Sequence, residues 1–173
     1  VVHFVLNGFT VTETDGTQTK NFYVSRDIAS QSDMTLSFST ANGTALSPSD
    51  YTAQSAVSVT MPAASTANVN VSNTTIAGDQ IAEPTETFTG TISENNYNSQ
   101  QVVLTTPTAT STIYDDDVIV ITLAGFSVTE TEATQVRNFR ASMNTTAQHD
   151  IVLLFSTANG TAVDANDFTA RTA

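Results

Sequence analysis

The sequence predicts an all-β fold, a sandwich of two antiparallel sheets with about seven strands per domain. Apolar and polar residues alternate over short runs, turn residues separate these runs, and no window has the spacing of an amphipathic helix. Of the 173 residues, 39% are hydrophobic, which is enough to form a core. We therefore expect an immunoglobulin-like β-sandwich, although the chain has no Cys and no Trp and so lacks the disulfide and core Trp of a true immunoglobulin domain.

A long internal repeat organises the chain. The segment GFTVTETDGTQTKNF begins at Gly8 and GFSVTETEATQVRNF begins at Gly125, an offset of 117 (125 − 8 = 117). FSTANGTA begins at Phe38 and recurs with the same offset. This period fits one sandwich domain of roughly 100 residues and is too long for a solenoid repeat. We predict a complete domain over residues 1–117 and the N-terminal half of a second copy over residues 118–173, in tandem and without a linker.

The second copy stops at Ala173, the counterpart of Ala56. Half a sandwich exposes its inner face and its unpaired strand edges. We therefore expect the chain to be a piece of a longer tandem array.

Strands within the first copy are expected where apolar residues alternate with polar ones. The expected runs are residues 1–6, 9–14, 20–25, 34–40, 57–61, about 69–71, about 88–92 and 108–114. The first two runs are interpreted as one strand that is split at Asn7-Gly8, and Asn42-Gly43 is a dipeptide typical of tight turns.

The chain is strongly acidic, with Lys+Arg 5, Asp+Glu 17 and a formal net charge of -12. Such a charge repels nucleic acid and anionic membrane surfaces, so no nucleic-acid partner is expected. No run approaches the ~18 consecutive apolar residues of a membrane span, so no membrane insertion is expected either. The sequence contains no nucleophile motif and no phosphate-binding glycine loop, and we do not expect an enzyme.

The acidic residues of the first copy occur at four places that are strand ends or loops. They are Glu13, Asp50, the loop residues Asp79, Glu83 and Glu86, and the closing triplet Asp115, Asp116 and Asp117. Alternate loops of a sandwich meet at one pole, so we expect these places to converge. Two carboxylates ~5 Å apart repel by roughly 3 kcal/mol at an effective dielectric of 20, which favours a bound cation over an empty cluster.

Calcium is the cation that this composition favours. Ca²⁺ takes about 6–8 oxygen ligands, whereas Mg²⁺ requires stricter octahedral geometry and keeps its waters. With 2 His and no Cys, softer metals are disfavoured. If the triplet continues its strand, Asp115 and Asp117 face one way and Asp116 the other, which indicates more than one ion or an ion shared with the next domain. The competing interpretation is that these carboxylates are solvated turn residues.

Three segments in order resemble the Calx-beta domain family, found in sodium–calcium exchangers, an integrin β subunit and large bacterial surface proteins. The segments are LSFSTANGTALSPSDY, IAGDQIAEPTETF and TIYDDD. The resemblance covers the first copy and the truncated second one. It implies calcium ligands at Glu13, Asp50, Asp79, Glu83, Glu86, Asp115, Asp116 and Asp117, and at the backbone carbonyl of Ile81. In the second copy, Glu130 and Asp167 are the remaining counterparts.

The acidic loop departs from the family pattern at two positions. Gly78 and Gln80 stand where the best calcium sensors of the family carry Asp. Fewer carboxylates imply weaker binding, so the number and the affinity of the ions stay open.

From this resemblance we expect a calcium-binding structural or adhesive repeat of an extracellular or cell-surface stalk or filament, in a bacterial protein. Calcium would rigidify the junction where Asp117 runs into Val118. The expected partners are neighbouring Calx-beta-like domains of the same chain and other copies in a fibre, paired through edge strands. Two alternatives stay open: a regulatory calcium-sensor domain, and a carbohydrate- or ligand-binding module.

Overall fold

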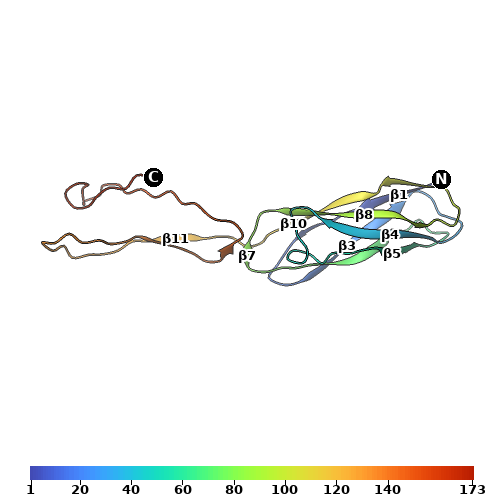
Figure 1. Ribbon diagram of the computed structural model, residues 1–173, viewed down its shortest axis with the longest axis horizontal. Helices are drawn as coiled ribbons and strands as arrows, with labels where there is room; N and C mark the ends of the chain where they lie inside the picture. Colours follow the sequence, from blue (N-terminus) through green and yellow to red (C-terminus); the bar gives the residue numbers. More distant parts are fainter.

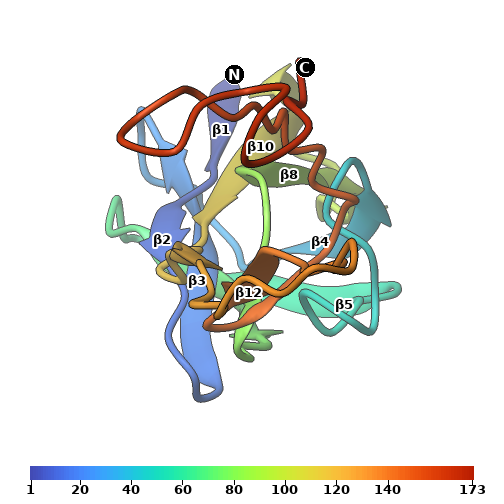
Figure 2. The same ribbon diagram turned by 90° about the vertical axis from the view of Figure 1, so that its left-hand side faces the viewer.

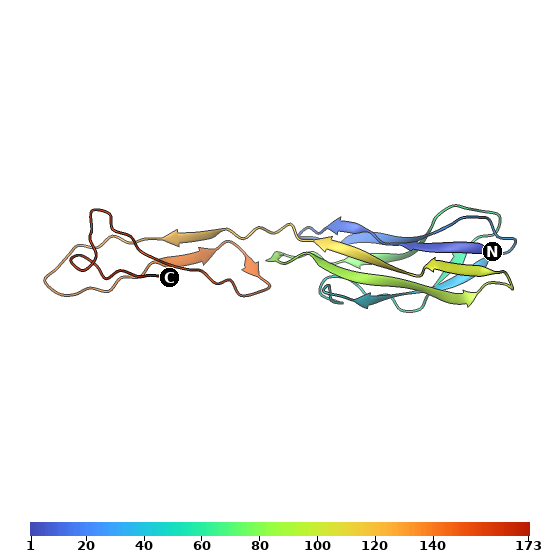
Figure 3. The ribbon, with the colours of Figure 1, turned by 90° about the horizontal axis from the view of Figure 1, so that it is seen from above.

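The computed structural model describes all of residues 1–173 and contains strands but no helix. It accordingly has no helix of the length and apolar character needed to cross a membrane. Residues 1–117, the first unit, and residues 118–173, the second unit, lie end to end in an elongated molecule (Figures 1 and 3). Every buried residue belongs to the first unit, so the hydrophobic core is confined to it.

The first unit is a sandwich of a four-stranded and a five-stranded sheet, as the alternation of apolar residues predicts. The four-stranded sheet has the order β6-β3-β1-β9, with strands Val69–Ile76, Gln18–Arg26, Val2–Asn7 and Val102–Thr106. The five-stranded sheet has the order β2-β10-β8-β4-β5, with strands Thr10–Thr12, Thr108–Tyr114, Glu86–Asn96, Met34–Asn42 and Val57–Met61. The prediction of an all-β sandwich is confirmed.

Two parallel pairings modify the expected antiparallel pattern. Strand β1 pairs with β9 and strand β2 pairs with β10, both in parallel. They arise because the split at Asn7-Gly8 separates two strands that belong to opposite sheets. A Cβ at Gly8 would lie 2.2 Å from the carbonyl oxygen of Thr110, so only glycine permits this crossing. Strand β9 was not expected, because the sequence VVLTT has no clear alternation.

An aromatic cluster joins the two sheets and positions the segments that carry the acidic residues. Phe88 of β8 packs edge-on against Phe22 of β3, with ring centroids 5.8 Å apart. Tyr51 stacks on Phe88 at 4.0 Å, and its hydroxyl donates a hydrogen bond of 2.7 Å to Asn42 Oδ1. Because Asp50 precedes Tyr51 and Glu86 lies two residues before Phe88, this packing holds both acidic residues over the end of the core.

The second unit repeats part of this framework without burying it. Strand β11 (Ile121–Ala124) pairs with β12 (Arg140–Met143), and the short β13 (Thr146–Ala147) pairs with β7 (Ile81–Ala82) of the first unit. The counterparts of the core rings Phe9, Phe22 and Phe38 are again in contact, but Phe126 is 45% and Phe139 is 44% exposed. In the view along the long axis, the second unit lies in front of the end of the sandwich (Figure 2).

Candidate metal centre

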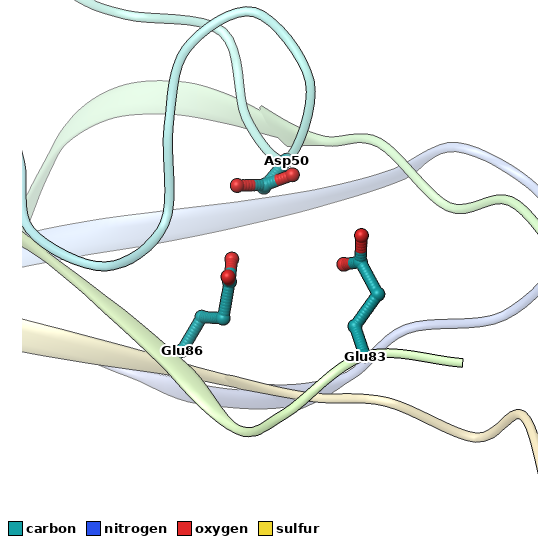
Figure 4. Close-up of side chains that lie close together, drawn as sticks. All are labelled: Asp50, Glu83 and Glu86. Carbon is teal, nitrogen blue, oxygen red and sulfur yellow. The ribbon is translucent and has the colours of Figure 1, made fainter. Parts of the chain in front are cut away.

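Three carboxylates meet at the end of the first unit that faces the second. Asp50, Glu83 and Glu86 each offer an oxygen within 4.8 Å of the others, and their side chains point toward one another (Figure 4). Asp50 and Glu86 are buried, with exposed fractions of 7% and 6%, while Glu83 is half-buried. We call these three residues the carboxylate cluster. Its members come from two loops and the first residue of β8, which the core packs together.

A short loop presents Asp50 to the cluster. The Leu46 backbone N–H donates to Asp50 Oδ2 at 2.6 Å, and the Asp50 N–H donates back to the Leu46 carbonyl at 2.9 Å. These two bonds close the turn and fix the carboxylate. The next residue, Tyr51, anchors the turn in the core.

Burial and mutual repulsion disturb the titration of the cluster. The pKa of Glu86 is raised to about 7, first by burial and then by the neighbouring Asp50 carboxylate. Burial also raises the pKa of Glu83, with the charges of Asp50 and Asp79 adding to the effect. Near neutral pH, part of the cluster therefore retains a proton unless a cation offsets the charge.

The donor set fits a hard divalent cation. Oε2 of Glu86 is buried and has no hydrogen-bond partner in the protein. An unpartnered buried carboxylate oxygen is costly, and a cation among three all-oxygen ligands would satisfy it. Asp50, Glu83 and Glu86 are thus the residues that would hold calcium in the first unit.

The triplet at the end of β10 forms a second acidic group. Strand β10 ends at Tyr114, and the Asp117 N–H donates to Asp115 Oδ1 at 2.9 Å. This turn brings oxygens of Asp115, Asp116 and Asp117 within 4.8 Å of one another. Asp116 was expected to face away from Asp115 and Asp117 if the strand continued through the triplet. The strand does not continue, because the Asp115 carboxylate accepts the backbone N–H of Asp117 and closes a turn.

Glu13 connects the two acidic groups. It is buried, and its backbone N–H donates to the Tyr114 carbonyl at 2.8 Å. The pKa of Glu13 is raised to about 7, first by burial and then by the charges of Glu83, Asp115, Asp79 and Asp50. Since those charges come from all the other acidic places of the first unit, the four places predicted from the sequence lie around one pole.

Asp79 and Ile81 lie at the edge of this pole. The exposed Asp79 accepts the Ile81 backbone N–H at 2.7 Å, which closes a small turn. Ile81 belongs to β7 and pairs in register with Thr146 of the second unit.

A family model describing the Calx-beta domain matches residues 1–117 and, a second time, residues 115–173. The chain belongs to the Calx-beta domain family. None of the curated proteins compared with it matches.

Solved Calx-beta structures share the fold. The apo-form Calx CBD1 domain is 19% identical, with a TM-score of 0.50, over 67% of this chain and 98% of that one. The calcium binding domain CBD12 of CALX1.1 is 20% identical, with a TM-score of 0.55, over 74% of this chain and 53% of that one. CBD12 of CALX1.2 gives 17% identity and a TM-score of 0.53, over 69% of this chain and 48% of that one. The chain thus spans about half the length of each CBD12 structure.

The structure gives a reason for the departure of this Calx-beta chain at Gly78. A Cβ at that position would lie 1.7 Å from the carbonyl oxygen of Thr14, so no side chain fits there. Gln80, the other departure, donates from its side-chain amide to Asp15 Oδ2 at 2.8 Å. Close packing against the backbone of Thr14, in the loop after β2, thus excludes a carboxylate at position 78, and at position 80 a hydrogen-bonding amide stands in place of one.

The acidic residues of the second Calx-beta copy are not gathered into a cluster. Asp167 Oδ2 accepts the Val163 N–H at 2.7 Å, as its counterpart Asp50 does with Leu46. Both Asp167 and Glu130 are exposed, and neither belongs to a group of carboxylates that could hold an ion. The turn at Asp167 forms because it depends only on neighbouring residues. A carboxylate cluster would also need counterparts of Glu83 and Glu86, which residues 118–173 do not contain.

One residue at the site was missed in the sequence because it is neither acidic nor in the first unit. The Gln148 side-chain amide donates to Glu83 Oε1 at 2.9 Å. The only signal in the sequence is that Gln31 stands at the same place of the repeat, 117 residues earlier (148 − 31 = 117).

Proposed function

We propose that the chain is a calcium-binding structural repeat whose bound ion stiffens the connection between successive domains. The observation that carries the proposal is the buried, unpartnered Oε2 of Glu86, within a cluster of three carboxylates at the junction of the two units. A structural relative supports it, since CBD12 of CALX1.1 is a calcium binding domain.

The role of the ion would be to neutralise charge that the fold has already brought together. Asp50, Glu83 and Glu86 would bind it directly, and the triplet of Asp115, Asp116 and Asp117 would bind a second ion or share one. Calcium supplies a positive charge that offsets the repulsion among these groups. Glu13 is buried beside both acidic groups, and the charges of Asp50 and Glu83 in one and of Asp115 in the other raise its pKa. A bound cation would offset this repulsion as well.

The position of the site links binding to domain geometry. Asp117 runs directly into Val118, so the last acidic residue of one unit adjoins the first residue of the next. Strands β7 and β13 join the two units beside the cluster (Figure 1). A cation that fixes the acidic loop, residues 78–86, would fix this pairing and restrict bending of the junction.

We place this repeat in an extracellular or cell-surface stalk or filament, with an adhesive or structural role and no enzymatic one. The tandem copies and the net charge of -12 support this proposal. Neighbouring domains of the same chain are the first partners, and other copies in a fibre are the second.

The test is thermal unfolding of the chain in millimolar calcium and in excess chelator. A ligand at ~100 times its dissociation constant stabilises by about 2.7 kcal/mol, which should raise Tm by several degrees. Glu86→Gln should abolish the increase. Glu94→Gln, an exposed residue of the same strand, is the matched control and should retain it.

A wild-type Tm that is equal in calcium and chelator would refute the proposal and leave the carboxylates as solvated turn residues. Small-angle scattering of the same samples tests the stiffening. Calcium should narrow the distribution of angles between the units, and an unchanged distribution alongside a raised Tm would leave a site without the structural role.

A further inference from the structure

Residues 144–149 of the second unit, which we call the junction loop, run beside the acidic loop of the first. Strand β13 of the junction loop pairs in parallel with β7 of the acidic loop. The Gln148 backbone N–H then donates to the Ala82 carbonyl at 3.0 Å. Backbone hydrogen bonding thus sets the place from which the Gln148 side chain extends.

That side chain reaches two members of the carboxylate cluster. Gln148 Nε2 donates to Glu83 Oε1 at 2.9 Å and lies 3.5 Å from Glu86 Oε1. These two acceptors belong to the first unit, 65 and 62 residues earlier in the chain. Gln148 thus supplies hydrogen bonds to the carboxylate oxygens that face the second unit. Oε2 of Glu86, inside the cluster, has no hydrogen-bond partner.

The base of the junction loop is anchored to the segment that follows the acidic triplet. The Val120 N–H donates to Asn144 Oδ1 at 2.6 Å, and Asn144 Nδ2 donates to the Val118 carbonyl at 2.9 Å. The first unit has the same hydrogen bond at the equivalent positions of the repeat, where the His3 N–H donates to Asp27 Oδ1 at 2.9 Å. Both ends of the contact are therefore held, one by Asn144 and the other by β7.

We propose that Gln148 is a cation ligand contributed by the second unit, its Oε1 joining the carboxylates of Glu83 and Glu86. The inference rests on the proposed calcium function. A primary amide carries an acceptor oxygen and a donor NH₂ on one planar group, so a half-turn about its last side-chain bond exchanges them without moving the backbone. Side-chain amide carbonyls are among the oxygen ligands that calcium accepts.

This assignment explains how a site in one domain acts on the next. The three carboxylates all belong to the first unit, so a cation held by them alone does not require the second. An oxygen from Gln148 makes the site incomplete without the junction loop. The ion then bridges the two units directly, in addition to fixing the acidic loop.

The experiment compares Gln148→Ala with the wild-type chain by calorimetric titration with calcium alone. The matched control is Gln31→Ala, because Gln31 is exposed at the same place of the repeat in the first unit, away from the cluster. We expect Gln148→Ala to bind about tenfold more weakly, because the site loses one of its oxygen ligands. Gln31→Ala should bind like the wild type.

The sign of the change decides the question. If the amide only donates to the carboxylates, it competes with the cation, and Gln148→Ala would bind equally or more tightly, which overturns the inference. A wild-type chain that binds no calcium would instead refute the proposed function itself. Because Gln148 is exposed, Gln148→Ala should unfold in chelator within about 0.5 kcal/mol of the wild type, so a weaker affinity would not reflect a lost fold.

Discussion

The backbone N–H of Glu83 donates a hydrogen bond to Asp115 Oδ2, with 2.7 Å between the nitrogen and the oxygen. This bond ties the acidic loop to the triplet that ends β10. Asp115 therefore has two functions: it is a negative charge beside Glu83 and Glu13, and it is the acceptor that positions the loop. The two functions have opposite effects on the stability of the metal-free protein, so substitutions can separate them.

Asp115→Asn keeps an oxygen acceptor and removes the charge, whereas Asp115→Ala removes both. In chelator, we expect Asp115→Ala to lose about 1.5–3 kcal/mol of unfolding free energy, the range for a hydrogen bond to a charged group. Asp115→Asn should be at least as stable as the wild type, because one repulsive charge is gone. Denaturant unfolding in chelator measures both values. Equal losses for the two variants would show that the charge, which both substitutions remove, and not the acceptor oxygen accounts for the effect of Asp115.

The metal-free protein should become less stable as the pH rises from about 4.5 to about 7. Burial raises the pKa of Glu13 and of Glu86 from 4.5 to about 7, so in this window the folded chain holds protons that the unfolded chain has lost. Below the window both states are protonated and the stability is retained, and above it the loss is complete. Thermal unfolding in chelator across pH 5 to 8 measures the slope.

Two variants check the origin of this pH dependence. Glu13→Gln should flatten the decrease, because one of the two groups with a strongly raised pKa no longer titrates. The exposed Glu94→Gln should leave the decrease unchanged. An unfolding free energy that increases between pH 5 and pH 8 in chelator would contradict the assignment. With calcium present the decrease should disappear, since the cation favours the ionised carboxylates.

Gly78→Ala should weaken both the fold and the site. Its Cβ would lie 1.7 Å from the Thr14 carbonyl oxygen, and that segment is held in place because the Glu13 N–H bonds to the Tyr114 carbonyl. We expect a loss of about 1–3 kcal/mol, as for other overpacked positions, and a smaller increase of Tm with calcium, because the acidic loop shifts. Gly16→Ala is the matched control, since a Cβ there meets nothing within 4 Å. Similar unfolding free energies for the two variants would show that the loop yields without cost.

The strands and the repeat could be predicted because their signals are local. Alternation with a period of two marks β3, β4, β5 and β10 directly, since successive side chains of a strand face opposite sides. The boundary between β1 and β2 was recognised, but their assignment to opposite sheets was not. That assignment depends on the close approach of Gly8 to Thr110, about a hundred residues away in the chain.

The candidate site was predictable to the same extent. All four acidic places were visible as strand ends or loops, and the structure brings them to one pole. The sequence did not show that Glu86 is buried with an unpartnered oxygen, since burial there depends on how Tyr51 and Phe88 stack. It also did not show that the triplet turns at Asp115, because the turn depends on a hydrogen bond and not on alternation.

The sequence by itself determined the β-sandwich, the repeat of 117 residues and the acidic places, because each is written in neighbouring side chains or in direct self-similarity. The tertiary structure alone decided which carboxylates meet and that Gln148 of the second unit reaches Glu83 of the first. Those relationships join residues that are distant in the chain. They arise only when the core has packed and β7 has paired with β13, so no local pattern contains them.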